Sequence, residues 1–522
     1  MYRDPRPVRA VRILTSWAPA AVPVALMLGL GLWGLNRDAL YTAECATFWA
    51  AHLSWPAFHH LISHVDAVHA LYYVLVHFAF FLGHNDVVMR LPSVVGAVGA
   101  VLLTYVLATR LGGSRVLAFA AAGLTALAPS MSRYAQSGRS YTLVTLFTLL
   151  AGLALVRAVQ RDARGAAGWS VTRAWLLYGV VLTVSGYLHE LSLVLLAVAH
   201  GVTLLWARVR VRTLRNWVLA AGAAAALLAP LALLSIREDA AVSWIPRPGL
   251  RSAVDLGRFF FGSSWTVVVV LAALAVLGAV AARVPAWPGL PGRFTLTAFA
   301  VPLLLLPPMV LLVESRLAKP LYDSRYVLFC LPAGMMLAAA GLERLLRLVP
   351  RLGPSRLLWL PLVVAVAATG VVQWRDQQWL RTPDSRSWNL LQAADILRGH
   401  VRAGDGVDFV PRYYNYLEEV YPWALAGARD FRMKRGPVAS GTLHGLVKTG
   451  APLRRTMLAH DRIWLVGDPA TLPRHHGRHQ LRILHRHYTR RSTYRFRGGR
   501  VELYVRKPSV RPPHHRRVTG PA

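Results

Sequence analysis

The sequence predicts a polytopic α-helical membrane protein with a small α/β domain at its C-terminal end. Of the 522 residues, 55% are apolar and only 16% are charged, whereas about 25% of the residues of a typical soluble protein are charged. The apolar residues gather in runs of about 20, the length that a helix needs to cross a bilayer. These observations exclude a soluble single-core enzyme and a disordered chain, which contains few apolar residues.

The charge of the chain is carried by arginine. Only four of its 59 basic residues are lysine, and the formal net charge is +35. No nucleic-acid partner is predicted, because the apolar runs require lipid. Two cysteines, Cys45 and Cys330, permit at most one disulfide. The composition, rich in Arg, Ala, Val and Leu, indicates a high-GC bacterium.

Eleven apolar runs are predicted to cross the membrane. They are 13–35, 91–109, 116–130, 140–157, 174–187, 191–206, 217–235, 265–282, 295–313, 326–342 and 357–373. A further run at 67–83 is short and contains His69 and His77. When it is left out, the arginine-rich loops and the arginines of the N-terminus share one side, as the positive-inside rule requires. We therefore expect 67–83 to lie along the outer interface, with a cytoplasmic N-terminus and an extracytoplasmic C-terminus at the plasma membrane.

The predicted domains follow from this topology. Residues 1–373 form the transmembrane domain, with a long outer loop at 36–90, and residues 374–508 form an extracytoplasmic α/β domain. Residues 374–522 hold 28 basic and 11 acidic side chains, and the last part, 509–522, is predicted to be disordered. Hydrophobic periodicity predicts a helix early in 387–410 and three strands, at Val407–Val410, Arg462–Val466 and Val501–Val505.

Polar residues gather on the predicted outer side, and the outer loop is richest in them. It contains Glu44 and Asp66, and Arg90 follows at the start of the second span. A carboxyl group beside aromatic rings in a medium of low dielectric has a raised pKa, which suits a general base. The alternative is that Glu44 and Asp66 cap short helices or pair with Arg90.

A second polar cluster lies in the short outer loop between the third and fourth spans. Two arginines six residues apart, with hydroxyl and amide donors between them, are typical of a phosphate clamp. The alternative is that these side chains anchor the loop at the membrane interface. The residues are Arg133, Tyr134, Gln136 and Arg139, and the same surface is extended by His189, Glu190 and Arg325.

No cofactor is predicted. The sequence has no glycine-rich phosphate loop, no dinucleotide fingerprint and no serine-nucleophile motif. The spacing of His64, Asp66 and His69 leaves a divalent metal open, but it matches no established zinc pattern, so no metal site is assigned.

The order of these motifs resembles the GT-C superfamily of membrane glycosyltransferases, over roughly residues 13–345. An acid soon after the first span is followed by Asp66 before an aromatic pair, then by Arg90-Leu-Pro-Ser and Arg133-Tyr-Ala-Gln. The branch most similar contains the protein O-mannosyltransferases and the lipid A aminoarabinose transferases. The resemblance implies transfer of a hexose, most simply mannose, with inversion, from a polyprenyl-phosphate donor to an extracytoplasmic acceptor.

The same resemblance assigns roles to individual residues. The acidic pair of the family falls on Ala43 and Glu44, so the aspartate usually assigned as the base is absent. Asp66 matches the second acidic position and is predicted to be the base, with Glu44 orienting the acceptor or binding sugar hydroxyls. The residues that match the donor-phosphate region are Arg90, Arg133 and Arg139.

Because of Ala43, a second class of function stays open. The chain is then a catalytically lapsed scaffold, or a transporter, that binds anionic envelope polymers through its basic external tail. A transporter is expected to show internal symmetry and charges near the middle of the membrane, and this sequence shows neither. The sequence leaves open whether an acceptor is a protein, a glycolipid, a wall polymer or a secreted metabolite.

Overall fold

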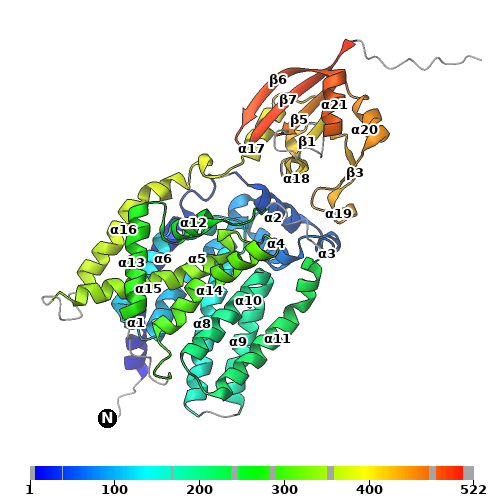
Figure 1. The fold of residues 1–522 in the computed structure, drawn as a ribbon. Helices are drawn as coiled ribbons and strands as arrows, with labels where there is room; N and C mark the ends of the chain where they lie inside the picture. Colours follow the sequence, from blue (N-terminus) through cyan, green and yellow to red (C-terminus); the bar gives the residue numbers. More distant parts are fainter. Residues whose placement is uncertain are drawn as a thin grey trace, which may run out of the picture. The chain divides into compact units, whose positions relative to one another are not determined.

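A computed structural model of the chain describes residues 6–37, 39–165, 168–236, 245–281, 290–349, 358–468 and 478–508. It contains two compact units, and each unit draws on separate segments of the chain (Figure 1). We call the first, Met1–Arg37 with Asp66–Thr382, the transmembrane unit. We call the second, Asp38–Val65 with Pro383–Ala522, the α/β unit.

Helices build the transmembrane unit. Its α-helices are α1 (Arg6–Leu32), α4 (Ala70–Ala79), α5 (Asp86–Arg110), α6 (Arg115–Leu127), α7 (Pro129–Ala135), α8 (Tyr141–Ala163), α9 (Trp169–Leu188), α10 (Glu190–Trp206), α11 (Val211–Ser235), α12 (Leu250–Phe261), α13 (Trp265–Ala281), α14 (Leu296–Leu317), α15 (Leu331–Arg347) and α16 (Trp359–Trp379). Short 3₁₀ turns flank α4, at Ala67–His69 (η1) and Phe80–Leu82 (η2), and another precedes α15, at Ser324–Cys330 (η4).

The chain is a multi-pass membrane protein. Among the described residues, six helical segments are long and apolar enough to cross a bilayer, or up to eight if two bent helix pairs each count as one span. The eleven predicted runs coincide with α1, α5, α6, α8, α9, α10, α11, α13, α14, α15 and α16. The fold class predicted from the sequence is thereby confirmed, while the number of crossings stays a prediction.

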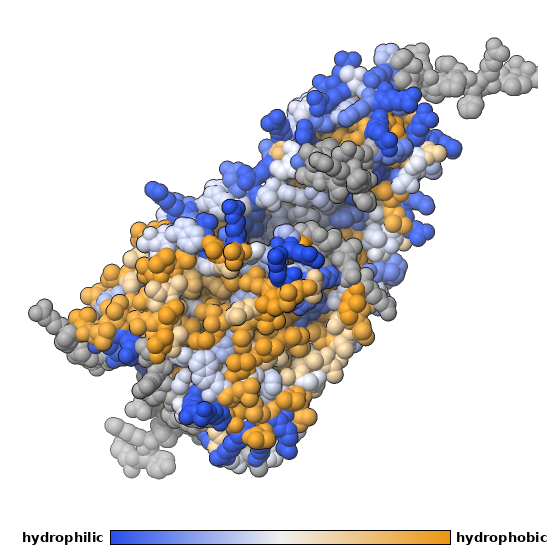
Figure 2. Space-filling view, viewed as in Figure 1, coloured by the Kyte–Doolittle hydropathy of each residue, from blue (hydrophilic) through white to orange (hydrophobic). Residues whose placement is uncertain are grey.

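The helices differ in how far they are buried within the unit. α8 packs against α5 and α9. Of its apolar 18-residue stretch, 72% is buried inside the structure, whereas the corresponding value for α11 is 17%. α11 accordingly exposes large apolar side chains such as Val218, Leu219 and Leu227, which a soluble protein would cover. Figure 2 shows apolar side chains spread over the helices of this unit. This surface is what a protein surrounded by lipid requires.

Two breaks shape the part of this unit that holds the candidate site. α6 and α7 meet at an angle of 62°, and α12 and α13 meet at 85°. Pro129 begins α7, and a proline at the start of a helix disfavours helical backbone in the residue before it. Gly262 ends α12 with a φ of +127°, a conformation that side chains rarely permit. The polar segments around both breaks line the pocket described below.

The α/β unit contains a mixed five-stranded sheet in the order β2-β1-β5-β7-β6. β1 is parallel to β2 and β5, with Gly406 opposite Arg429 and Ile463, whereas β7 is antiparallel to β5 and β6. The strands are β1 (Gly406–Val410), β2 (Arg429–Asp430), β5 (Arg462–Gly467), β6 (Tyr488–Phe496) and β7 (Gly499–Arg506), with β3 (Met433–Arg435) and β4 (Leu446–Val447) pairing separately. The helices are α2 (Thr42–His52), α3 (Trp55–Ile62), α17 (Leu390–Arg398), α18 (Tyr416–Val420), α19 (Pro437–Ser440), α20 (Gly450–Met457) and α21 (Arg478–His487).

Apolar side chains of the strands and helices form the core of the α/β unit. Leu453 and Met457 of α20 and Leu484 of α21 pack with Ile463 and Leu465 of β5. The predicted helix and three strands of this region are present as α17, β1, β5 and β7. β6 was not predicted because it is an edge strand with mostly exposed, arginine-rich residues, so it lacks the alternation by which half-buried strands are recognised.

The division into compact units differs from the expected domains in two respects. Helices α2 and α3, from the outer loop, pack against α18 and α19 and so belong to the same unit as the C-terminal sheet. The boundary near the end of α16 lies at Thr382 rather than at 373. Cys45 and Cys330 are both buried, and they are not joined in a disulfide. The expectation of disorder for 509–522 concerns residues outside those that the structure describes.

Candidate active site

Asp66 lies at the centre of a polar cluster in the transmembrane unit. It precedes the 3₁₀ turn η1 and has a φ of +62°, one of three positive values among the described residues other than glycine. Aspartate tolerates this left-handed conformation better than most residues. Its carboxylate accepts a hydrogen bond from the hydroxyl of Tyr73, and its Oδ1 lies 3.7 Å from Nε2 of His69. The turn thus directs Asp66, His69 and Tyr73 toward one another.

Arg139 completes this group from a distant part of the chain. Its guanidinium donates to the Tyr73 hydroxyl at 3.4 Å and to Nε2 of His69. Its backbone is fixed because Ser93 of α5 donates to the Arg139 carbonyl at 2.8 Å. Arg139 is 7% exposed, so its charge lies where the effective dielectric is low.

The surroundings set the protonation of the two titratable neighbours of Arg139. Burial raises the pKa of Asp66, and this effect outweighs the lowering by Arg139 and by the Tyr73 hydrogen bond. Burial lowers the pKa of His69, and Arg139, His189 and Arg325 lower it further. His69 is therefore neutral, which agrees with its Nε2 accepting a hydrogen bond from Arg139. A carboxylate with a raised pKa beside a fixed cation is suited to proton transfer.

Aromatic rings and a second arginine extend the cluster. The ring of His189 lies 4.7 Å from that of Tyr326, and both rings lie 6.2–6.3 Å from Tyr141. The guanidinium of Arg325 lies over Tyr141 and Tyr326, at 5.9 and 5.6 Å from the ring centres. Burial, with Arg139 and Arg325, lowers the pKa of His189 to about 4. Its Nδ1 is buried and has no hydrogen-bond partner among the described residues, so it remains available to a ligand.

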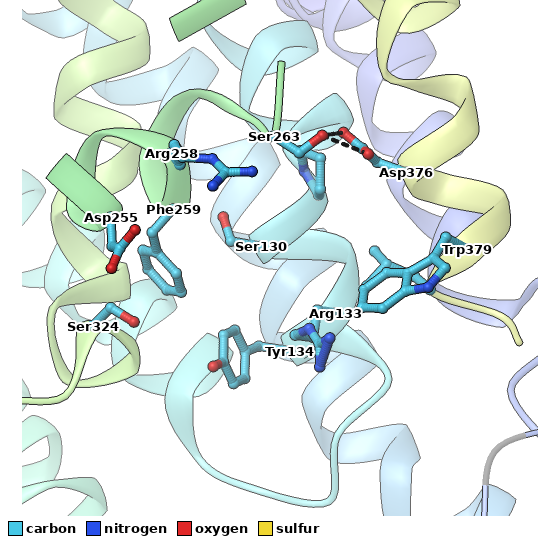
Figure 3. Close-up of a pocket in the computed structure, with 12 residues that line it drawn as sticks. Ser130, Arg133, Tyr134, Asp255, Arg258, Phe259, Ser263, Ser324, Asp376 and Trp379 are labelled. Carbon is cyan, nitrogen blue, oxygen red and sulfur yellow. Dashed lines mark hydrogen bonds between the residues drawn. The ribbon is translucent and has the colours of Figure 1, made fainter. Parts of the chain in front are cut away.

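A pocket of about 370 Å³ adjoins this cluster. Tyr134 is part of both, because it lines the pocket and its ring lies 5.2 Å from that of Tyr141. Ser324, next to Arg325 in the chain, lines the pocket too. Figure 3 shows the side chains that α7, α12 and α16 direct into this space. The two arginines of the predicted phosphate clamp thus have different surroundings, since Arg133 lines the pocket whereas Arg139 contacts His69 and Tyr73.

Arg90 and Gln136 contact the end of α1. Nη1 of Arg90 donates to the Leu35 carbonyl at 2.7 Å, and the guanidinium lies 3.6 Å from Asp86. The amide nitrogen of Gln136 lies within 3.2 Å of three carbonyl oxygens, those of Leu30, Gly31 and Trp33. A helix leaves its last four carbonyls without intrahelical partners. Gln136 satisfies two of them, those of Leu30 and Gly31, and Arg90 holds the Leu35 carbonyl just after the helix, where the outer loop begins.

Glu44 and Glu190 have other surroundings. Glu44 belongs to the α/β unit, where it is fully buried in the first turn of α2 and accepts a bond from the backbone nitrogen of Tyr41 at 3.4 Å. This is the capping arrangement that the sequence left open. Glu190 begins α10 in the transmembrane unit, and its carboxylate faces the Ser235 hydroxyl and Lys319.

Several contributors were not predicted from the sequence. Tyr73 was noted only as part of an aromatic pair, although it bridges Asp66 and Arg139. Arg381, at the end of α16, donates to the Leu30 carbonyl at 2.6 Å and to the Ser132 hydroxyl at 2.8 Å. An arginine at the end of an apolar run is ordinarily an interfacial anchor, so nothing in the local sequence indicates this role.

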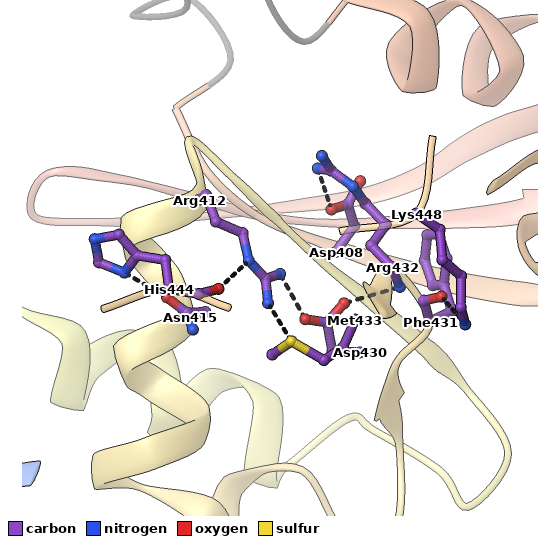
Figure 4. Close-up of polar contacts among 9 residues, drawn as sticks. All are labelled: Asp408, Arg412, Asn415, Asp430, Phe431, Arg432, Met433, His444 and Lys448. Carbon is purple, nitrogen blue, oxygen red and sulfur yellow. Dashed lines mark hydrogen bonds and ion pairs between the residues drawn. The ribbon is translucent and has the colours of Figure 1, made fainter. Parts of the chain in front are cut away.

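The α/β unit holds a separate polar cluster after β1 and β2 (Figure 4). Arg412 pairs with Asp430 and donates to the His444 carbonyl at 3.0 Å, while Arg432 pairs with Asp408 at 2.9 Å. Glu418 lies close to Asp430, and burial, together with Asp430 and Glu419, raises its pKa to about 7. The ion pairs fix the loops at the carboxyl ends of the parallel strands.

Comparison with known proteins identifies the fold. No protein-family model and no curated protein matches the sequence. The structure is similar to that of ArnT from Cupriavidus metallidurans in the apo state, with a TM-score of 0.60 and 13% identity over 95% of this chain and 99% of that one. The same protein bound to undecaprenyl phosphate gives a TM-score of 0.56, at the same identity and coverage. An oligosaccharyltransferase from Archaeoglobus fulgidus is more distant, with a TM-score of 0.47 and 10% identity over 96% of this chain and 75% of that one.

The chain has the fold of ArnT, which is the GT-C fold expected from the sequence. The likeness extends over nearly the whole of both chains, and so includes the α/β unit as well as the helices.

Proposed function

We propose that the protein transfers a sugar from a polyprenyl-phosphate donor to an extracytoplasmic acceptor, and that the sugar is a hexose such as mannose. The observation that carries the proposal is the cluster in which Asp66, with its raised pKa, lies beside the buried cation of Arg139. A structure of ArnT, whose fold this chain shares, is bound to undecaprenyl phosphate. A polyprenyl phosphate brings a lipid tail and an anion, which suit a membrane unit with buried arginines.

The proposed reaction is an inverting displacement. An acceptor hydroxyl oxygen attacks C1 of the sugar and forms the new C1–O bond, while its proton passes to the Asp66 carboxylate. The bond between C1 and the phosphate oxygen breaks, and polyprenyl phosphate leaves with the electron pair. Arg139 and Arg325 stabilise the charge that develops on the leaving phosphate. His69 remains neutral and holds Arg139 in place.

The proposal assigns the base to Asp66 because Ala43 cannot accept a proton. Tyr73 donates to this carboxylate and so holds it in one orientation. Glu44 is engaged at the start of α2 in the α/β unit, and its role toward the acceptor stays a prediction.

One observation favours the alternative function, a scaffold that binds anionic polymers. β6 is an edge strand on which Arg491 and Arg495 are exposed, and such cations attract anionic polymers. A scaffold requires no transfer activity, so an assay of sugar transfer separates the two functions.

The test is transfer by the purified full-length protein in lipid vesicles. Polyprenyl-phosphate mannose labelled in the sugar is supplied with extracts of envelope components, and the labelled product is identified. Asp66→Asn should lower turnover about 10²–10⁴-fold, the typical contribution of a general base. Asp395→Asn, which alters an exposed carboxylate of α17, is the matched control.

Binding of labelled polyprenyl phosphate separates the role of Asp66 from that of Arg139. Asp66→Asn should leave this affinity intact, whereas Arg139→Gln should lower it about tenfold or more, since charge-assisted hydrogen bonds contribute about 1.5–3 kcal/mol. Full activity of Asp66→Asn would remove the base from the proposal. A wild-type protein that transfers no hexose from any polyprenyl donor, while binding anionic polymers, would favour the scaffold.

A further inference from the structure

The pocket beside the cluster has a composition that differs from that of a phosphate site. Arg133 of α7 and Arg258 of α12 supply two positive charges, but Asp255 of α12 and Asp376 of α16 supply two negative ones. A site for phosphate presents an excess of cations and hydrogen-bond donors. Formal charges that cancel, and carboxylates that would repel an anion, favour a neutral ligand.

Both kinds of charged group in the pocket are held in place. Ser263 donates to both oxygens of Asp376, at 2.6 and 2.5 Å (Figure 3). The guanidinium of Arg133 lies 5.6 Å from the ring centre of Trp379, and that of Arg258 lies 5.6 Å from Trp265. Fixed carboxylates and guanidinium groups are suited to a ligand with several hydroxyls, because a carboxylate accepts and a guanidinium donates in defined directions.

Aromatic rings supply the apolar walls. Tyr134, Phe259 and Trp379 line the pocket, and the rings of Tyr134 and Phe259 lie 6.0 Å apart. The face of an aromatic ring is negative and attracts the polarised C–H bonds on the apolar face of a sugar ring. Flat walls combined with hydroxyl-binding side chains are the chemistry by which proteins recognise carbohydrate.

One polar atom in the pocket lacks a partner. Ser130 of α7 is 8% exposed, and its Oγ has no hydrogen-bond partner within the part of the chain that the structure describes. Figure 3 shows this hydroxyl pointing into the space below Arg258. A buried polar atom without a partner costs stability, so a ligand hydroxyl that reaches Ser130 gains a hydrogen bond that the protein alone leaves unmade.

We propose that this pocket binds a neutral mono- or disaccharide, the sugar end of a glycan or glycolipid acceptor. Its volume of about 370 Å³ lies near the lower end of the range of about 300–1,000 Å³ for small-molecule sites. Its role as an acceptor site rests on the proposed function. Tyr134 and Ser324 connect the pocket to the cluster around Arg325, and in this proposal the bound sugar supplies the hydroxyl oxygen that attacks C1.

Binding is tested first, without any donor. Saturation-transfer NMR with the full-length protein in nanodiscs uses methyl α-mannoside and maltose as soluble probes, octyl glucoside as a lipid-like probe and inorganic phosphate as a competitor. Ser130→Leu fills the pocket and should weaken glycoside binding at least tenfold, and Ser130→Ala should weaken it several-fold. Ser170→Leu, on α9, is the matched control and should bind like the wild type.

The relative binding of the probes distinguishes a glycolipid from a free glycan. A preference for octyl glucoside identifies a glycolipid, and equal binding of the soluble probes identifies a free glycan. Three results would overturn the proposal: no glycoside binds, Ser130→Leu binds as well as the wild type, or phosphate displaces the glycoside from the pocket.

A transfer assay with peptides and glycosides as acceptors then tests the sugar site separately from the proposed transferase activity. Labelled sugar that passes to hydroxyl-bearing peptides but to no glycoside would contradict the acceptor site and leave the transferase intact. Glycoside binding that depends on Ser130, in a protein that transfers nothing, would leave the sugar site intact and contradict the transferase.

Discussion

The reactivity expected of Asp66 depends on a balance between burial and two stabilising neighbours. Burial raises the pKa of this carboxyl group, and Arg139 and Tyr73 lower it. Only the ionised form accepts a proton, so turnover should fall as the pH falls through this raised pKa. The fall should therefore begin at a higher pH than it would for an exposed aspartate.

Replacing Tyr73 tests this balance. Tyr73→Phe removes the hydrogen bond that stabilises the ionised carboxylate, so the acidic limb of the rate profile should move to higher pH. Tyr72→Phe is the matched control, because the Tyr72 hydroxyl contacts Ser93 rather than Asp66. An acidic limb that is the same in the wild type and Tyr73→Phe would show that Asp66 is not the group that titrates.

Glu418 makes the stability of the α/β unit depend on pH. Burial and the neighbouring acids raise the pKa of Glu418 from 4.5 to about 7. A group whose pKa is raised in the folded state stabilises the fold fully below its unfolded pKa, and this stabilisation is lost as the pH rises through about 7. The unfolding temperature of this unit should therefore fall between pH 5 and pH 8.

Glu418→Gln keeps the neutral shape at every pH. At pH 8 this variant should unfold at a higher temperature than the wild type, and its dependence on pH should be weaker, as measured by thermal unfolding of the full-length protein in detergent. Asp395→Asn should behave like the wild type. If Glu418→Gln is destabilised at pH 8, the carboxylate contributes a favourable contact rather than a cost.

At the scale of elements, α13 and α15 approach more closely than any side chain permits at two positions. A methyl group at Gly278 would lie 2.0 Å from the Leu337 carbonyl oxygen, and one at Gly341 would lie 1.9 Å from that of Leu274. Small residues let helices in membranes pack at short distance. The contact holds α15, and therefore the segment with Arg325 and Tyr326 that precedes it.

Alanine at this contact should separate the helices. Gly278→Ala should destabilise the protein by about 1–3 kcal/mol, the usual cost of overpacking, and should lower its unfolding temperature in detergent. Gly222→Ala on α11 is the matched control, since a methyl group there would meet nothing within 4 Å; it should be neutral or slightly stabilising. Equal unfolding temperatures for the two variants would argue against the close contact.

The sequence predicts elements better than contacts, and the reason is physical. Apolar runs and strand alternation are local, so the helices and three of the strands were found from them. The hydrogen bond from Arg139 to Tyr73 joins residues 66 positions apart, and nothing in either segment reports it. Arg90 and Gln136 have the chemistry of phosphate ligands, yet Arg90 contacts the Leu35 carbonyl just after α1, and Gln136 contacts carbonyls at the end of α1. Residue type gives the chemistry that is possible, and only the fold selects the partner.

At the scale of the whole molecule, the topology has a direct test. In a protein lacking Cys45 and Cys330, cysteines introduced at exposed His60 and His400 should react from outside the cell with an impermeant maleimide. A cysteine at Arg215, in a predicted cytoplasmic loop, should react only after the membrane is opened. Labelling of Arg215 from outside, or protection of either of the other two positions, would contradict the predicted orientation.

A compact body that stands in water on one face of a membrane has all of its chain on that face. Asp38–Val65 and Pro383–Ala522 belong to one compact unit. If that unit is extracytoplasmic, as predicted, the chain that leaves it after residue 65 must be back on the same side by residue 383. A path that starts and ends on one side crosses the bilayer an even number of times, whatever its course. Ten predicted spans, from 91–109 to 357–373, lie on that path. Counting α4 as an eleventh would make the number odd, so parity agrees with the prediction that α4 is no crossing, by a route that involves no arginine at all.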